Sequence, residues 1–326
     1  MIGMAVVGYG YWGQKLARNV AGQNRARLVA IAEPNAARGD RARHDHPVAL
    51  IEGDALAAVT APGVEAVVIA TPPAQHRAVA LAAIAAGKNV LIEKPCGASL
   101  DDARAIVAAA QARGLVLMVD HTFIYAPAVE ALAQAVGELG DLVYVESTRT
   151  NLARFDSAAG VVRDLAIHDL AILDHVLGRT ARLVTARGRT PPGEHEDFAF
   201  LTLDYAGLPA HLHVDCLSPV KIRRITIGGT RGTVIFDDVE PVEKIRLYRR
   251  GDMSAAELRA GLRSGEIASP PVSSAEPLAR CVAHFIDCIA DGRRPLTDGA
   301  SALRLLSVVE DAERQLTAAS PRHQPG

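Results

Sequence analysis

The feature that most constrains the fold is a series of short apolar segments in the first third of the chain. They are rich in Val, Ile and Leu without polar alternation, which is typical of strands covered on both faces. These segments span residues 4–7, 28–32, 66–70, 89–92 and 115–119. Helical patterns lie between them, such as QHRAVALAAIAAG (75–87) and SLDDARAIVAAAQARG (99–114). Repeated βα units of this kind predict a doubly wound parallel sheet.

The pattern changes after residue 120, where segments begin to alternate between apolar and polar residues, as half-buried antiparallel strands do. Six such segments span residues 181–190, 196–205, 208–218, 220–229, 231–238 and 243–250. We therefore predict an α/β Rossmann domain over residues 1–122, followed by an α+β domain over residues 123–326 with a mostly antiparallel open sheet. Helices predicted at 276–291 and 299–317 either close the second domain or pack back on the first.

Composition limits the class of protein. The chain has 326 residues, 49% of them hydrophobic and 22% charged, with a formal net charge of -2. These values are typical of a globular two-domain protein and give no reason to expect nucleic acid or an acidic membrane as partner. The start, MIGMAVVGYG, lacks the basic region of a signal peptide, and no apolar run is long enough to span a membrane. Four cysteines without a CxxC pair indicate reduced thiols, so we expect a cytoplasmic protein.

GYGYWG (8–13) follows the first predicted strand and fits the GxGxxG pattern of dinucleotide-binding turns. Gly8 would permit the tight turn, Gly10 the approach of a pyrophosphate, and Gly13 close helix packing. Glu33 ends the second strand, where a carboxylate can accept ribose hydroxyls and repel a 2′-phosphate. This favours NAD, with NADP as the alternative because Arg38 is nearby. A glycine turn without a ligand is the other reading.

Two further motifs end the next strands, ATPPAQH (70–76) and NVLIEKPCG (89–97). Ligands in open α/β sheets bind beyond the carboxyl ends of the strands. Lys94 is one of only five lysines among 35 basic residues, so a lysine here indicates a specific role, although a surface lysine at a strand end is the alternative. The predicted cofactor-binding residues are Gly8, Gly10, Tyr11, Trp12, Gly13, Glu33, Thr71, Pro72, His76, Glu93 and Lys94.

The segment VVRDLAIHDLAILDHVLG (161–178) is a helix-like apolar run with several titratable side chains. Burying such groups is costly unless they are paired or shift their pKa. Asp164 and His168 are four residues apart, so an α-helix would place them on one face. They could form a core pair, an acid–base couple, or half of a metal site with Asp169 and His175. Because no cysteines or further carboxylates cluster here, we expect no metal.

These motifs together resemble the Gfo/Idh/MocA oxidoreductases, a family that includes glucose–fructose oxidoreductase and inositol dehydrogenase. The resemblance rests on AVVGYGYWG, AVVIATPPAQH, NVLIEKP, DLAIH and the tail HFIDCIADGRRPLTDGASALRLL, and it covers nearly the whole chain. It implies an NAD(P)-dependent oxidoreductase in which Lys94, Asp164 and His168 form the catalytic constellation.

A finer resemblance concerns VDHTFIYAPAVEAL (119–132) and VESTRTNLARF (145–155). These segments look like the branch that acts on nucleotide-activated sugars, such as UDP-N-acetylglucosamine 3-dehydrogenases and relatives in antibiotic deoxysugar or aminosugar pathways. Arg163 departs from that branch, which often has an aromatic residue there. The predicted substrate-binding residues are His121, Tyr125, Asn151 and Arg163, and the alternative for each is a local turn, core packing or a place at the rim.

We therefore predict hydride transfer between a nicotinamide and a secondary alcohol or ketone, at C3 of a sugar or sugar nucleotide. His168 would exchange the hydroxyl proton, Lys94 would stabilise the oxygen, and Asp164 would orient His168 or a second hydroxyl. The alternatives are an inositol, cyclitol or free-sugar dehydrogenase, a metal-dependent dehydrogenase, and a non-catalytic NAD-binding sensor. The less covered face of the second sheet predicts a homodimer or homotetramer.

Overall fold

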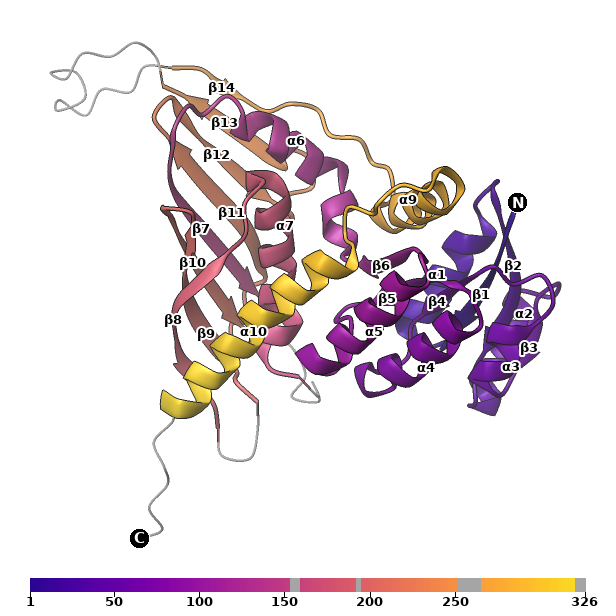
Figure 1. Cartoon of the computed structure of the whole chain (residues 1–326). Coiled ribbons are helices and arrows are strands. Elements are labelled where there is room, and N and C mark those ends of the chain that lie inside the picture. The colour runs from indigo at the N-terminus through magenta and orange to yellow at the C-terminus, as the bar shows by residue number, and fades with distance from the viewer. Residues whose placement is uncertain (153–158, 192–194, 251–264, 320–326) are drawn as a thin grey trace, which may run out of the picture. The chain divides into compact units, whose positions relative to one another are not determined.

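The computed structural model describes residues 1–152, 159–191, 195–250 and 265–319. The chain divides into two compact units (Figure 1). The first unit comprises Met1–Tyr125 and Ala275–Leu306, and the second comprises Ala126–Ser274 and Ser307–Gly326. The first unit therefore contains residues from the C-terminal part of the chain, which is the arrangement in which a late helix packs back on the first domain.

The first unit is built on a six-stranded parallel sheet in the order β3-β2-β1-β4-β5-β6, which confirms the predicted doubly wound sheet. Figure 1 shows α4 and α5 together over one face. The strands are β1 (Ile2–Val7), β2 (Ala26–Ala32), β3 (Leu50–Glu52), β4 (Ala66–Ile69), β5 (Asn89–Glu93) and β6 (Leu117–Asp120). The helices are α1 (Tyr11–Ala21), α2 (Ala36–Asp45), α3 (Ala55–Thr60), α4 (Pro73–Ala85), α5 (Leu100–Ala112) and α9 (Pro277–Asp291), with a 3₁₀-helix η1 (Thr122–Tyr125).

Burial explains why these strands were visible in the sequence. All four residues of β4 are buried, as are the three central residues of β5. Local contacts bound the helix within the predicted range 99–114: the Ser99 hydroxyl accepts a hydrogen bond from the Asp102 amide at 3.1 Å, and Gly114 lies just beyond α5 with φ of 62°. The edge strand β3 was not predicted, because three residues that are not fully buried give no periodic pattern.

The second unit contains an eight-stranded sheet in the order β14-β13-β12-β11-β7-β10-β9-β8. It is antiparallel except where β10 runs parallel to β7, so the mostly antiparallel prediction is confirmed. Its strands are β7 (Leu142–Thr150), β8 (Arg182–Arg189), β9 (Phe198–Tyr205), β10 (Leu208–Asp215), β11 (Ile222–Gly229), β12 (Gly232–Asp237), β13 (Ile245–Arg249) and β14 (Ile267–Ala268). The sequence did not predict β7 or β14.

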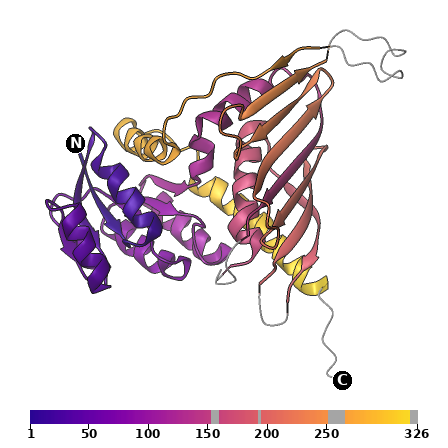
Figure 2. The same cartoon turned by 180° about the vertical axis from the view of Figure 1, so that it is seen from behind.

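Helices cover one face of this sheet. They are α6 (Pro127–Val136), α7 (Ile167–Leu177), and the part of α10 (Gly299–Ala319) that follows Leu306. Figure 2 shows the opposite face, over which no helix lies in the described part of the chain. Side chains such as Leu201, Leu212 and Ile227 are fully buried and form the core between the sheet and the helices.

The predicted helix over 161–178 is not uniform. Val162–Ala166 form a π-helical turn, η2, in which the Val162 carbonyl accepts a hydrogen bond from the Ile167 amide, five residues on. The α-helix begins only at Ile167, so the prediction of a single helix over the whole segment was wrong. Among the described residues, no helix has the length and apolar character needed to cross a membrane.

Candidate active site

The glycine loop between β1 and α1 has the geometry of a phosphate-binding turn. Gly8 has φ of 96°, and a Cβ on it would lie 2.6 Å from the Ala70 carbonyl oxygen. A Cβ on Gly13 would lie 2.0 Å from the Gly8 carbonyl oxygen, so both positions require glycine. A Cβ on Gly10 would meet nothing within 4 Å. Because Gly10 also begins α1 without a side-chain cap, open space lies where helix N–H groups can hold a pyrophosphate. The residues fit a dinucleotide.

Two predicted cofactor residues, Tyr11 and Trp12, are 71% and 41% exposed at the start of α1. Their rings meet edge to face with centroids 5.3 Å apart, and the Lys15 ammonium lies 4.0 Å and 4.6 Å from the two centroids. This cation–π group holds the aromatic side chains in place beside the glycine loop while leaving them accessible.

Glu33 lies at the end of β2 with its side chain 3% exposed. Its Oε2 accepts the Tyr9 amide at 2.9 Å, and its Oε1 accepts the Asn35 amide at 2.9 Å and the Arg38 guanidinium at 2.8 Å. Burial raises the pKa of Glu33, but these hydrogen bonds outweigh it and hold the pKa below its ordinary value. A carboxylate offers about four lone-pair positions. Glu33 therefore fixes the glycine loop to β2 and has limited capacity left for ribose hydroxyls.

The motif after β4 is tied to the motif after β5 through a histidine. His76, in the first turn of α4, is fully buried. Its Nδ1 lies 2.9 Å from the Pro95 carbonyl oxygen and its Nε2 lies 2.8 Å from the Thr71 carbonyl oxygen. Its ring nitrogens thus contact the backbone of both loops. Pro72 is the residue from which α4 begins, and the buried Thr71 hydroxyl has no hydrogen-bond partner among the described residues.

Lys94 follows β5 and lies beside His121, which follows β6. The Lys94 amide donates to the carboxylate of Glu93, and both side chains are partly buried. Burial and then the positive charge of Lys94 lower the pKa of His121 to about 3, so its imidazole is neutral near neutral pH. Its Nδ1 is buried without a partner in the described part of the chain. The structure thus brings together two residues that were predicted for different roles.

Sequence reasoning missed Asp120, the last residue of β6, which pairs in register with Glu93. Its Oδ1 accepts the Thr122 hydroxyl at 2.6 Å and the Cys281 thiol at 3.4 Å, whereas its Oδ2 has no partner in the described residues. Burial raises the pKa of Asp120. The available signal was a carboxylate that ends a buried strand next to the strand of Lys94.

Tyr125 was predicted to contact substrate, but its ring is 6% exposed and its hydroxyl lies 3.1 Å from the Thr297 hydroxyl. Core packing describes its present position. Asn151 follows β7, where its backbone amide donates to the Asp215 carbonyl at 3.0 Å. Its neighbours at 153–158 lie outside the described residues.

The catalytic pair predicted in the second unit spans the change of helix type. Asp164 lies within η2, and His168 lies in the first turn of α7; both side chains are partly buried. The i, i+4 rule for an α-helix therefore does not apply strictly to this pair. π-Helical turns inside helices are common at functional sites, so this turn is a second feature, besides the predicted catalytic pair, that is typical of a functional segment.

Arg163 and Asp169, from the same segment, have structural partners. The Arg163 guanidinium binds Glu313 through two contacts of 2.8 Å and 2.6 Å. Asp169 is buried and accepts hydrogen bonds from Arg149 at 2.6 Å and 2.9 Å and from the Ser147 hydroxyl at 2.9 Å. Asp169 is thus a core residue, and Arg163 would have to exchange its partner to meet a substrate.

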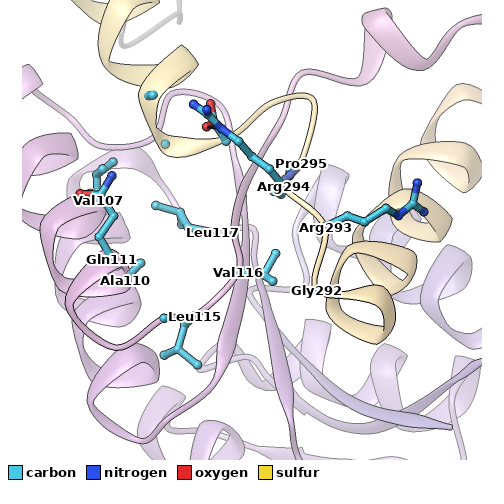
Figure 3. Close-up of a pocket in the computed structure, with 14 residues that line it drawn as sticks. Val107, Ala110, Gln111, Leu115, Val116, Leu117, Gly292, Arg293, Arg294 and Pro295 are labelled. Carbon is cyan, nitrogen blue, oxygen red and sulfur yellow. Dashed lines mark hydrogen bonds and ion pairs between the residues drawn. The ribbon is translucent and has the colours of Figure 1, made fainter.

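Among the described residues, no group of three or more His, Cys, Asp or Glu side chains could hold a metal ion. A pocket of about 450 Å³ lies between α5 and the loop that joins α9 to α10 (Figure 3). Leu115, Val116 and Leu117 line it. These residues are at the amino end of β6, so this pocket is at the opposite end of the strand from Asp120 and His121.

Comparison with known proteins gives two family matches. Residues 2–121 match the profile of the oxidoreductase family with an NAD-binding Rossmann fold, and residues 130–235 match the GFO/IDH/MocA C-terminal domain.

Several named dehydrogenases are similar in sequence. The chain is 28% identical to D-apiose dehydrogenase of Paraburkholderia graminis, over 94% of this chain and 85% of that one. It is 30% identical to UDP-N-acetylglucosamine 3-dehydrogenase of Acidithiobacillus ferrooxidans, over 93% of each chain. It is also 30% identical to trans-1,2-dihydrobenzene-1,2-diol dehydrogenase of Sus scrofa, over 63% of this chain and 64% of that one.

Crystal structures of oxidoreductases are similar to this chain in fold. An oxidoreductase from Magnetospirillum magnetotacticum superposes with a TM-score of 0.81 at 31% identity, over 95% of this chain and 98% of that one. The UDP-N-acetylglucosamine 3-dehydrogenase from Acidithiobacillus ferrooxidans superposes with a TM-score of 0.84 at 25% identity, over 97% and 98% of the two chains.

Proposed function

We propose that the substrate of this chain is a sugar or a sugar nucleotide, oxidised at C3. The chain belongs to the Gfo/Idh/MocA family of NAD(P)-dependent oxidoreductases, which act on CH–OH groups. The observation that carries the proposal is the position of Lys94. It lies at the carboxyl end of β5, in the sheet whose glycine loop fits a pyrophosphate. It is also next to His121, whose buried Nδ1 has no hydrogen-bond partner among the described residues.

The glycine loop at Gly8–Gly13 would hold NAD, which would supply a hydride acceptor or donor. The task of this chain is to bind the sugar, to stabilise charge on the reacting oxygen and to move the hydroxyl proton. We assign the oxygen contact to Lys94, because a fixed ammonium stabilises developing alkoxide charge in a site from which water is excluded. We assign the proton to His168, since an imidazole exchanges protons near neutral pH. Asp164 would orient His168 or a second hydroxyl. The same residues serve the reverse reaction, the reduction of a 3-ketosugar.

The choice of a nucleotide-activated sugar is supported by the relative from Acidithiobacillus ferrooxidans, which matches almost the whole chain in sequence and in fold. A free sugar is the second candidate, because the D-apiose dehydrogenase matches a similar share of this chain. Inositol and other cyclitols remain within the same chemistry. A non-catalytic NAD sensor would not need Lys94, Asp164 and His168 together, so the presence of all three opposes that class.

The deciding experiment is a panel of sugar nucleotides, free sugars and cyclitols, each mixed with NAD and followed by NADH absorbance. We expect turnover with a UDP- or dTDP-linked hexose and little with the free sugars. His168→Ala should lose turnover by about 10²–10⁴-fold, the usual contribution of general acid–base catalysis, and His44→Ala, at an exposed histidine of α2, should lose none. Turnover with free sugars alone would select the second candidate, and turnover with cyclitols alone would contradict the proposed substrate class.

We also propose that two copies of the chain associate through the sheet face that carries no helix among the described residues. Tyr144 and Phe200 are 38% and 40% exposed, on strands whose neighbouring residues Val145 and Leu201 are buried. Exposed aromatic side chains on an open sheet are typical of an interface. Light scattering at micromolar concentration should give a dimer or tetramer, and a monomer would contradict the proposal.

A further inference from the structure

His76 lies between two loops that carry predicted site residues. His76 lies in the first turn of α4, which begins at Pro73, and its ring is fully buried. One ring nitrogen lies 2.9 Å from the carbonyl oxygen of Pro95, the residue after Lys94. The other lies 2.8 Å from the carbonyl oxygen of Thr71, the second residue after β4. A single side chain therefore contacts both segments at the carboxyl ends of neighbouring strands.

The chemistry of these contacts is unusual because both partners are acceptors. A carbonyl oxygen accepts hydrogen bonds, and a neutral imidazole has only one N–H to donate. Only the protonated ring, in which both nitrogens donate, can bond both carbonyl oxygens at once. Burial lowers the pKa of His76 below its ordinary value, because the hydrogen bonds to Pro95 and Thr71 offset the effect of burial only in part. The geometry opposes that shift, since a bare ring nitrogen at either distance would face the lone pairs of a carbonyl oxygen. The two distances are both within the normal range for a hydrogen bond, so the geometry favours two bonds.

We propose that His76 is a positioning residue whose ring fixes the Lys94 loop and the Thr71 loop relative to one another. The Nδ1 bond to Pro95 holds the backbone next to Lys94 and so places the ammonium. The Nε2 bond to Thr71 holds the loop from which the cofactor would be bound. His76 itself is buried and touches neither substrate nor reacting atoms in this arrangement. The inference rests on the proposed roles of Lys94 and of the Thr71 loop.

Two amide substitutions separate the two bonds. In His76→Asn the amide nitrogen is attached to Cγ, as Nδ1 is, so it can keep the bond to Pro95 and lose the bond to Thr71. In His76→Gln the amide nitrogen lies one atom further out, near the position of Nε2, so it can keep the bond to Thr71 and lose the bond to Pro95. Each amide retains donors of the right kind. The pair is therefore matched in chemistry and differs in which loop it holds.

The expected result is a split between turnover and cofactor affinity. His76→Asn should weaken NAD binding by about five- to tenfold with kcat nearly unchanged, and His76→Gln should lower kcat by about tenfold with NAD affinity nearly unchanged, the sizes expected for one hydrogen bond. NAD affinity can be measured without substrate, because Trp12 is the only tryptophan and lies in the first turn of α1, beside the glycine loop, where bound NAD should quench its fluorescence. His44→Asn and His44→Gln, at an exposed histidine of α2, are the controls.

Two outcomes would overturn the proposal. Wild-type values in both variants would show that the contacts are not needed, and equal losses of kcat and affinity in both would show that the ring only fills space. Should either variant fail to fold, ¹⁵N NMR of histidine-labelled wild-type protein is the second measurement. Both ring nitrogens of His76 should carry a proton, and a ring with one bare nitrogen would refute the double bond. Absence of sugar turnover in the wild type would refute the proposed function. The NAD titration and the NMR measurement would still test the two contacts of His76.

Discussion

Buried polar groups at two places in the molecule differ in the hydrogen-bond partners that they have. Inside the second unit, Arg149 and Asp169 are 2% and 3% exposed, joined by contacts of 2.6 Å and 2.9 Å, and Ser147 donates a further hydrogen bond to the carboxylate. At the strand ends of the first unit, three buried atoms have no partner among the described residues: Thr71 Oγ1, Asp120 Oδ2 and His121 Nδ1.

This difference distinguishes polar groups that stabilise the fold from polar groups that are available to bind a ligand. Most buried polar atoms in folded proteins are hydrogen-bonded, and an unsatisfied one costs about 1–3 kcal/mol. The Arg149–Asp169 pair avoids that cost by its geometry. These three atoms of the first unit lie at the carboxyl ends of β4 and β6, on either side of the strand that Lys94 follows, where a bound dinucleotide and substrate can satisfy them. Their cost to the free protein is therefore consistent with a binding site.

The largest effect that tests this view is expected from Lys94→Arg. The charge is retained, but a planar guanidinium cannot place one compact donor on the substrate oxygen. We expect turnover to fall by about 10²–10³-fold, as when a donor to a developing oxyanion is lost, with NAD affinity and melting temperature unchanged. Steady-state kinetics beside an NAD titration is the measurement. Lys88→Arg is the matched control, since the Lys88 ammonium donates to the Val64 carbonyl oxygen, away from the carboxyl ends of the strands, and the variant should stay active. An active Lys94→Arg would show that only charge matters there.

The opposite pattern is expected from Arg149→Ala, which should affect stability first. It would leave the Asp169 carboxylate buried without its cation, which typically costs about 3–5 kcal/mol. Chemical denaturation should show this loss, while Arg224→Ala, which breaks a pair with Asp237 at the surface, should cost about 0–1 kcal/mol. Replacing both partners, Arg149→Met with Asp169→Leu, should recover most of the stability. Equal costs for Arg149→Ala and Arg224→Ala would remove the second half of the comparison.

The sequence predicted the elements that depend on local pattern. The parallel strands β1, β2, β4, β5 and β6 were visible because their residues are apolar on both faces, and the glycine loop because its spacing reflects steric contacts within a few residues. The positions of Lys94 and Glu33 at strand ends followed from the same units.

What could not be predicted depends on contacts between distant residues. Strand β7 was missed because it contains Ser147 and Arg149, which look exposed in sequence and are buried only because Asp169 lies opposite them. The π-helical turn at Val162–Ala166 has no signature in residue spacing. His76 was predicted to bind the cofactor, but its two carbonyl contacts come from loops that meet only in the folded sheet.

A smaller effect is expected in the pH dependence of stability. The pKa of His121 is lowered to about 3 by burial and by the charge of Lys94, whereas an unfolded histidine titrates at about 6.5. Below pH 6.5 the unfolded chain binds more protons than the folded chain, so the stability present above that pH is lost as the pH falls toward 3. Between pH 7 and pH 5 the loss should be about 2 kcal/mol, and His121→Leu should abolish this part of it. Urea unfolding at both pH values measures the difference, with His44→Leu as control; parallel losses in wild type and His121→Leu would show that this ring is not held neutral.

The smallest effect, and the most direct test of the comparison, is expected from Thr71→Val. Valine has the shape of threonine and removes only the hydroxyl that lacks a partner among the described residues. Because no hydrogen bond of that hydroxyl is lost in the free protein, the unfolding free energy should stay the same or rise slightly. If the hydroxyl binds the cofactor, the dissociation constant for NAD should rise by about two- to tenfold, the effect of one hydrogen bond, and Trp12 fluorescence would measure it.

Thr150→Val is the matched control, since the Thr150 hydroxyl donates to the Val220 carbonyl at 2.6 Å and accepts a hydrogen bond from the Ile222 amide at 3.1 Å. That variant should lose about 1–3 kcal/mol of stability and keep its NAD affinity. A Thr71→Val protein that is destabilised and binds NAD normally would mean that the unpartnered atoms of the first unit are not reserved for a ligand.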